Sequence, residues 1–141
     1  MIDICFVCTG DTCRSVMAER IARKKAKEKG LDINFSSAGL VANDENISQN
    51  AKKALKQLGY DDSDRKSVLL DRINPTTLYV CVTDAHKKWI KSNRVLSFRA
   101  LAGEVVDPYG KDLKTYIDTA KQIEKNVDVL LDKIEKLRGD L

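Results

Sequence analysis

Short apolar runs alternate along the chain with segments in which apolar residues recur at helical spacing. Ile4 to Val7 is such a run and stops at Thr9-Gly10, which favours a strand buried on both faces of a parallel sheet. From Ser15 to Lys29 the apolar residues repeat with the period of a helix, and Gly30 follows as a stop signal. The pattern therefore predicts a strand, a loop and a helix at the start of the chain.

The same alternation continues towards the other end. We expect strands at 33–38, 78–82 and 94–98, a helix near 48–58, and a short helix capped by Thr83 or Asp84 that runs through Ile90. A loop around 103–110 carries Asp107-Pro108. The final segment has the apolar stripe of a long helix packed on a sheet, formed by Ala120, Ile123, Val127, Leu130, Leu131, Ile134 and Leu137. Alternating strands and helices predict a parallel α/β fold.

Length and composition narrow the class of protein. With 141 residues and no linker or repeat, we expect a single domain over residues 1–141, and a monomer. A formal net charge of +4, spread over many basic residues, is too weak to indicate a nucleic-acid partner. We find no targeting segment and no apolar stretch that could span a bilayer, so we expect a cytoplasmic protein without a membrane partner. In that compartment the four cysteines indicate reduced or catalytic thiols.

The loop Cys8-Thr9-Gly10-Asp11-Thr12-Cys13-Arg14-Ser15 joins the first strand to the first helix. Unpaired N–H groups at a helix N-terminus, together with the helix dipole, bind a doubly charged anion. Arg14 adds a planar fork that matches two phosphoryl oxygens. The same positive field favours a thiolate, the nucleophilic form of cysteine. One loop therefore predicts both a phosphate site and its nucleophile, Cys8.

A separate proton donor is required next to a cysteine nucleophile. Asp107 is the candidate, because the flanking glycines place it on a movable loop that Pro108 stiffens. Taken alone, Asp107-Pro108 is an ordinary turn. With the cysteine loop present, we interpret it as the general acid.

These residues resemble the low-molecular-weight protein tyrosine phosphatase family. The likeness includes the Cys-x5-Arg-Ser loop, Met17-Ala18-Glu19 after it, Ser37-Ala38-Gly39 after the second strand, and Asp107-Pro108-Tyr109. The resemblance implies a central four-stranded parallel sheet with helices on both faces, and no cofactor. It also implies that Cys8 becomes phosphorylated and water then releases phosphate, while Asp107 protonates the leaving group and later activates the water. Ser15 would hold Cys8 as thiolate.

The substrate expected from the resemblance is a phosphorylated protein, and the loop also binds phosphate-like anions. Family members that act on phosphotyrosine usually carry a bulky aliphatic residue at the position of Thr12, and segment 40–50 has no aromatic residue, so that a phenyl ring would stack only on Tyr109. The loop instead resembles that of the bacterial protein arginine phosphatases, and Asp107 suits a guanidinium. We therefore expect phosphoarginine as the substrate, with phosphotyrosine as the alternative. A purely structural role of Thr12, in which it only packs against or caps the loop, is the other interpretation of this residue. Substrate-binding candidates are Thr9, Gly10, Asp11, Thr12, Cys13, Ser15 and Tyr109.

Asp11 departs from the family, which normally has asparagine there. A carboxylate accepts hydrogen bonds but donates none, and its charge opposes the field that ionises the nucleophile. The residue matching the family's supporting histidine is Asp64. Two acids would then face each other, which is favourable only if one is protonated or if Arg65 or Lys66 intervenes, so we expect activity that is weaker or shifted in pH.

The remaining cysteines suggest other chemistry. Cys5 and Cys8 form a Cys-x-x-Cys, but on a strand they point to opposite faces, and His86 lies in a lysine-rich helix without a partner, so we expect no metal. Cys13 shares the loop with Cys8, and we expect a reversible disulfide that protects the nucleophile. For arsenate reduction, Cys81 in a buried strand is a poor relay.

Three further interpretations concern binding. A pocket that only binds phosphorylated proteins is the alternative if Asp11 has spoiled catalysis. The basic stretch from Arg20 to Lys29 is interpreted as a solvated helix face. Trp89 and Tyr79 are interpreted as core or helix-packing aromatics.

Overall fold

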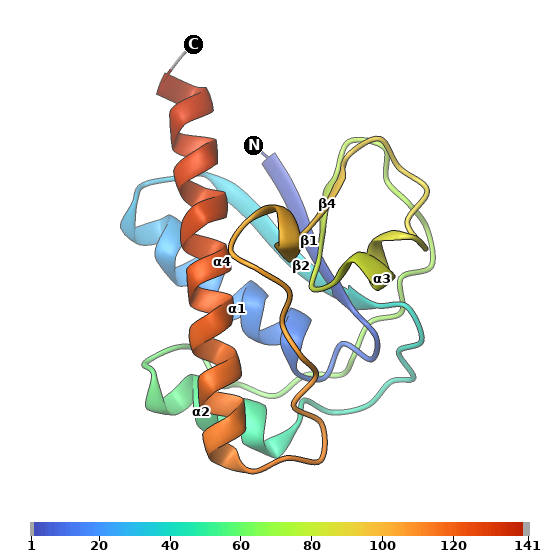
Figure 1. Ribbon diagram of the computed structural model, residues 1–141, viewed down its shortest axis with the longest axis vertical. Helices are drawn as coiled ribbons and strands as arrows, with labels where there is room; N and C mark the ends of the chain where they lie inside the picture. Colours follow the sequence, from blue (N-terminus) through green and yellow to red (C-terminus); the bar gives the residue numbers. More distant parts are fainter. Residues whose placement is uncertain (1, 140–141) are drawn as a thin grey trace.

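The computed structural model describes residues 2–139 and contains one parallel sheet. Its strands are β1 (Ile2–Cys8), β2 (Ile33–Gly39), β3 (Leu78–Cys81) and β4 (Val95–Ser97), in the order β2-β1-β3-β4. The helices are α1 (Arg14–Glu28), α2 (Gln49–Gln57), α3 (Asp84–Lys87) and α4 (Leu113–Gly139), with one 3-10 turn at Phe98–Ala100. The predicted four-stranded parallel sheet flanked by helices is confirmed (Figure 1).

Alternation along β1 divides the core into two layers. Ile4, Phe6 and Cys8 face a large cluster that includes the apolar sides of α1, α2 and α4. Cys5 and Val7 face a smaller cluster on the other side of the sheet, together with Tyr79 and Cys81. The prediction that Cys5 and Cys8 point to opposite faces is confirmed, because side chains along a strand alternate.

α1 lies against β1, β2 and α4, and α4 runs along the molecule beside it (Figure 1). The predicted apolar stripe of α4 is buried from Ala120 to Ile134. Leu137 was expected in that stripe but is exposed, because it lies one turn beyond the last buried position. Within residues 2–139, none of the helices combines the length and the apolar character that crossing a bilayer requires.

α3 is shorter than predicted. Thr83 caps it by accepting a hydrogen bond from the His86 N–H, as expected. The helix ends at Lys87 rather than Ile90, because Trp89 N and Ile90 N each bond to the carbonyl three residues earlier. This tighter turn directs Ile90 into the smaller core cluster.

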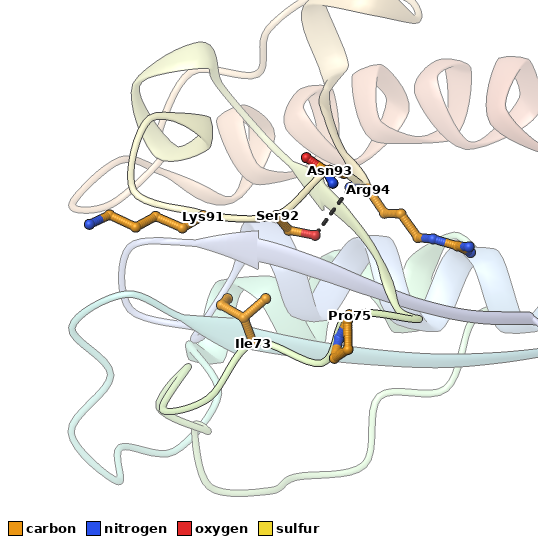
Figure 2. A pocket seen from close by; sticks show the side chains of 6 residues that line it. All are labelled: Ile73, Pro75, Lys91, Ser92, Asn93 and Arg94. Carbon is orange, nitrogen blue, oxygen red and sulfur yellow. Dashed lines mark hydrogen bonds between the residues drawn. The ribbon is translucent and has the colours of Figure 1, made fainter.

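The loops that follow β1, β2 and β3 gather at the carboxyl end of the sheet, as parallel strands require. At the amino end, before β3 and β4, lies a hollow of about 690 Å³ lined by Ile73, Pro75, Lys91, Ser92, Asn93 and Arg94 (Figure 2). This hollow includes no residue of the loop after β1, so the chemistry expected of that loop belongs to the carboxyl end.

Candidate active site

Cys8 is the last residue of β1 and is almost completely buried. Its Sγ lies 2.9 Å from Ser15 Oγ, and Asp11 N donates to it at 3.3 Å. Residues 9–13 pass around the sulfur before α1 begins at Arg14, and Cys13 at the N-cap supplies no side-chain cap. The first N–H groups of α1 therefore lack a capping side chain, which is the arrangement that binds anions.

Arg14 is buried at the start of α1. Its Nη1 donates to the carbonyl of Val105 at 3.1 Å, and its Nη2 lies 3.7 Å from Asp107 Oδ2. Among the residues described, Arg14 Nε and Arg20 Nε are the buried side-chain polar atoms without a hydrogen-bond partner. The Arg14 guanidinium is held at one end and keeps a donor for an oxyanion.

Asp107 lies on the loop before α4, with its side chain half exposed. Oδ1 accepts from Tyr109 N at 3.1 Å and lies 3.9 Å from Cys13 Sγ. A cavity of about 260 Å³ brings the predicted residues together and is lined by Cys8, Thr9, Gly10, Thr12, Cys13, Arg14, Val41, Glu45, Asp107 and Tyr109. Val41 and Glu45 come from the loop after β2, and no local motif identified them.

Asp11 and Ser15, expected among the substrate-binding residues, are fully buried and do not line the cavity. Ser15 Oγ donates to Asp11 Oδ1 at 2.7 Å, and Val68 N donates to Oδ2 at 2.9 Å. Asp11 has a φ of 54°, a left-handed conformation that aspartate and asparagine tolerate. Its carboxylate supports the shape of the loop rather than the cavity wall.

Arg65, rather than Asp64, lies beside the carboxylate of Asp11. Its Nη1 lies 3.0 Å from Asp11 Oδ2 and its Nη2 lies 3.3 Å from Oδ1, a two-pronged ion pair. Nη2 also contacts Ser37 Oγ and lies 3.4 Å from Glu19 Oε2. Asp64 instead accepts from Ile47 N and lies 3.6 Å from Lys52 Nζ. The two acids do not face each other, and Arg65 balances the charge of Asp11.

The other three thiols differ from Cys8 in their surroundings. Burial, with the nearby Cys8 and Asp107, raises the pKa of Cys13 to about 12, so this thiol is protonated at neutral pH. Burial also raises the pKa of Cys81 to about 12 and that of Cys5 to about 11. Cys8 and Cys13 line the same cavity as free thiols, and their reversible disulfide stays a prediction.

His86, expected to lack a neighbour with which it could hold a metal, has two hydrogen-bond partners that the sequence did not indicate. His86 is buried, its Nε2 lies 2.8 Å from Thr9 Oγ1, and its Nδ1 lies 2.6 Å from Thr83 Oγ1. Burial and then the Arg14 charge lower its pKa, so the ring is neutral. Thr9 follows β1 and Thr83 follows β3, and these strands are neighbours in the sheet. Only the strand order shows that the histidine reaches the segment from Cys8 to Ser15, here called the phosphate loop.

Trp89 was expected in the core or against a helix, and this is wrong: its side chain is 76% exposed. Tyr79 is buried as predicted, and its hydroxyl accepts from Asn74 N. The basic stretch in α1 is not uniformly solvated, since Arg20 is buried and donates to the carbonyls of Asp61 and Ser63.

Gly39, at the end of β2, contacts the phosphate loop directly. A Cβ at this position would lie 2.7 Å from the carbonyl oxygen of Thr9 and 2.8 Å from Asp11 N. The sequence marks this glycine only as part of Ser37-Ala38-Gly39, and its contact with the loop follows from the parallel pairing of β1 with β2.

Across residues 2–139 we find no cluster of histidine, cysteine and acidic side chains arranged to hold a metal ion. The arrangement that is present, a buried thiol at a helix N-terminus with a guanidinium and a carboxylate 3.7 Å apart, suits displacement at phosphorus.

Comparison with known proteins gives a consistent result. The sequence model described as "Low molecular weight phosphotyrosine protein phosphatase" matches residues 3–139. The protein-arginine-phosphatase of Bacillus subtilis is 30% identical over 149 aligned positions, which cover 97% of this chain and 99% of the relative. The low molecular weight protein-tyrosine-phosphatase PtpB of Staphylococcus haemolyticus is 30% identical, with 85% of this chain and 91% of PtpB covered.

Among solved structures, a mutant of the YwlE arginine phosphatase superimposes with a TM-score of 0.89. It is 29% identical, and the match covers 96% of this chain and 97% of that one. The mutant carries serine in place of a cysteine and is described with a phosphorylated active-site serine.

Proposed function

The chain belongs to the low molecular weight phosphotyrosine protein phosphatase family of cysteine-dependent phosphatases, and on that premise we propose that it hydrolyses phosphoarginine in proteins. In the first step Cys8 Sγ attacks phosphorus, the P–N bond breaks, and Asp107 gives a proton to the departing guanidine nitrogen. In the second step Asp107 takes a proton from water, whose oxygen attacks the phosphocysteine. Phosphate leaves and Cys8 returns as thiolate.

Arg14 and the N–H groups of the loop bind the phosphoryl oxygens in both steps. The guanidinium is positioned by the Val105 carbonyl, so little reorganisation is needed as the phosphorus becomes trigonal bipyramidal. Asp107 lies 3.7 Å from Arg14, close enough to meet the leaving group of a bound phosphoryl. The thiol at the end of β1 and the acid on the loop before α4 thus meet at the carboxyl end of the sheet.

The observation that carries the choice of phosphoarginine is the lining of the cavity. Glu45 shares its wall with Thr12 and with Asp107, the proton donor of the first step. A guanidinium leaving group gains from the Glu45 carboxylate, whereas a phenol does not. Tyr109 is the aromatic residue of this wall, and its side chain is mostly exposed. The naming of the Bacillus relative as a protein-arginine-phosphatase supports the same choice.

The test compares phosphoarginine and phosphotyrosine in peptides that are otherwise identical. We expect kcat/KM of the wild type to favour phosphoarginine. Thr12→Ile should reduce this preference and raise phosphotyrosine hydrolysis, because an aliphatic side chain replaces a hydroxyl at the cavity wall. Glu45→Gln should slow phosphoarginine hydrolysis about 5- to 10-fold, because a neutral amide contact is about half as strong as a charge-assisted one, and should leave phosphotyrosine hydrolysis nearly unchanged.

Thr76→Ile is the matched control, since Thr76 is an exposed threonine outside the cavity. A wild type that prefers phosphotyrosine would overturn the substrate assignment and leave a protein tyrosine phosphatase. Cys8→Ser must abolish release of phosphate from p-nitrophenyl phosphate, and activity that persists would contradict Cys8 as the nucleophile. A wild type that releases no phosphate would favour the phosphoprotein-binding module. Arsenate reduction is not favoured, because the Cys81 thiol is completely buried.

A further inference from the structure

A second hollow, of about 680 Å³, lies directly beside the catalytic cavity. It is lined by Thr9, Leu40, Val41, Leu70, Ala85, His86 and Trp89. Thr9 and Val41 line both spaces, so the two adjoin at one residue of the phosphate loop and one of the loop after β2. A polypeptide with its phosphorylated side chain in the cavity is therefore within reach of this hollow.

The lining has an apolar character. Leu40 and Leu70 form its inner wall, while Val41 and Trp89 are 68% and 76% exposed at its rim. The polar groups of the wall, Thr9 Oγ1 and His86 Nε2, form a hydrogen bond with each other at 2.8 Å. No side chain that carries a formal charge at neutral pH is among the lining residues. The hollow therefore suits an apolar side chain and offers little to a charged one.

Trp89 is exposed although burial of its large aromatic side chain would stabilise the folded protein. The tight turn after α3 holds it in this position, since Trp89 N bonds to His86 O and Ile90 is anchored in the core. Exposed apolar patches rimmed by polar groups commonly mark interaction sites. Here the patch adjoins the site at which a protein substrate reacts.

We propose that this hollow is a substrate subsite, which binds an apolar side chain of the protein substrate near the phosphorylated residue. The inference rests on the proposed function only in that the substrate is a phosphorylated protein. In an extended substrate, side chains two positions apart point to the same side, at a spacing of roughly 7 Å. The occupant is therefore a leucine-like residue two positions before or after the phosphorylated one.

Two peptide series, one with phosphoarginine and one with phosphotyrosine, test the subsite. Each series carries leucine or alanine at position −2 or +2 and is otherwise unchanged. For the wild type we expect leucine at one of the two positions to raise kcat/KM roughly 10-fold over alanine, mainly through KM, as is typical for a filled apolar pocket.

Two variants address the wall. Trp89→Ala should reduce the leucine-to-alanine ratio to about 2-fold, since the largest apolar surface of the hollow is removed. Ala85→Glu should reduce it as well, by placing a charge at an exposed position of the same wall. Leu137→Ala is the matched control, because it removes another exposed apolar side chain, from α4, and should keep the full ratio.

Three results would overturn the subsite. One is equal kcat/KM for leucine and alanine peptides at both positions of the wild type. Another is an equal loss on leucine and alanine peptides in Trp89→Ala. The third is an unchanged ratio together with an altered oligomeric state in Trp89→Ala by light scattering, which would make the patch an interface between copies of this chain. If phosphotyrosine proves the better substrate, the proposed function fails but the ratio in that series still decides the subsite.

Discussion

Ser15 lies between two groups that both require its single hydroxyl hydrogen. Its Oγ is 2.9 Å from Cys8 Sγ and 2.7 Å from Asp11 Oδ1. An ionised carboxylate only accepts, and so does a thiolate. When Ser15 donates to Asp11, it cannot stabilise the thiolate at the same time. Asp11 therefore competes with the nucleophile, although Arg65 balances its charge.

Asp11→Asn should relieve this competition. An asparagine amide can turn its N–H towards Ser15, which frees the serine hydrogen for the Cys8 sulfur. We expect kcat on p-nitrophenyl phosphate to rise at least about 10-fold, because a hydrogen bond to a charged group contributes about 1.5–3 kcal/mol, with faster alkylation of Cys8 by iodoacetamide at neutral pH. Unfolding free energy should fall by about 1–3 kcal/mol, because Arg65 loses its carboxylate.

Asp64→Asn is the control for this change, since it neutralises an acid one residue from Arg65 that contacts Lys52 and not the loop. It should alter neither kcat nor alkylation. Slower alkylation of Asp11→Asn than of the wild type would show that the carboxylate assists the nucleophile.

His86 makes stability depend on pH in a defined direction. Burial, followed by the Arg14 charge, lowers its pKa in the folded protein, while the unfolded chain keeps the ordinary value near 6.5. Below that value the unfolded state binds a proton that the folded state resists, so stability is full above about pH 6.5 and decreases as the pH falls through it.

Urea unfolding between pH 5 and 8 measures this effect. His86 is the one histidine of the sequence, so His86→Gln should remove the decrease that sets in below about pH 6.5 and leave only the contribution of carboxylates. Identical pH profiles for the two proteins would contradict a suppressed protonation of His86.

At the scale of elements, the site depends on how β1, β2 and β3 pair. β2 ends at Gly39 against the loop that follows β1, and Leu40 N and Val41 N donate to the carbonyls of Cys8 and Thr9. The loop is thus fixed from the β2 side by backbone, and from the β3 side by the histidine ring. Its position is determined by strands that are distant in sequence.

Gly39→Ala should displace the phosphate loop without unfolding the sheet. The added Cβ would meet backbone atoms of Thr9, Gly10 and Asp11 at 2.7–2.8 Å, and backbone yields less easily than a side chain. We expect kcat/KM on p-nitrophenyl phosphate to fall at least about 100-fold, because a misplacement of roughly 1 Å has that effect. Circular dichroism should remain native, and Gly30→Ala, at a helix end far from contacts, should keep its activity. Full activity of Gly39→Ala would show that the loop adapts.

The elements themselves were predictable because each has a strong local pattern. Every predicted strand and helix occurs, and the loop from Cys8 to Ser15 joins the expected pair. The exposure of Trp89 was misjudged and the hydrogen bonds of His86 were missed for one physical reason: the surroundings of both side chains come from strands and loops elsewhere in the chain. The end of α3 depends on Ile90 entering the core, and Arg65 finds Asp11 across 54 positions. Local periodicity carries no information on such contacts.

At the scale of the molecule, α4 is connected to the loop of the expected acid. Asn126 is buried in α4, accepts from Ala102 N at 2.9 Å and donates to Gly103 O at 3.0 Å. The same loop continues to Val105, whose carbonyl holds Arg14, and to Asp107. A helix that contributes no residue to the cavity thus helps to position two of its groups.

Asn126→Ala should therefore affect both stability and chemistry. Loss of the two hydrogen bonds, from Ala102 N and to Gly103 O, should lower the unfolding free energy by about 1–3 kcal/mol, at about 0.5–1.5 kcal/mol each. A looser Asp107 should slow aryl phosphates with poor leaving groups more than those with good ones, which need no acid. Kinetics with a series of aryl phosphates measure this, with the exposed Asn93→Ala as control. A uniform loss over the series would limit Asn126 to stability.

The ion pair between Arg65 and Asp11 also concerns the lifetime of the protein. Arg65 lies in the long irregular segment between α2 and β3, which is held to the loop by this pair and by Val68 N. A ligand that binds the folded loop and not the unfolded chain shifts the equilibrium towards the folded loop by mass action. It thereby also stabilises the segment that contains Arg65, because that segment is attached to the loop. Inorganic phosphate, the product of the reaction, would thus shield the Arg65-Lys66 peptide bonds from trypsin-like proteases while it competes with substrate. An enzyme slowed by its product would at the same time be degraded more slowly.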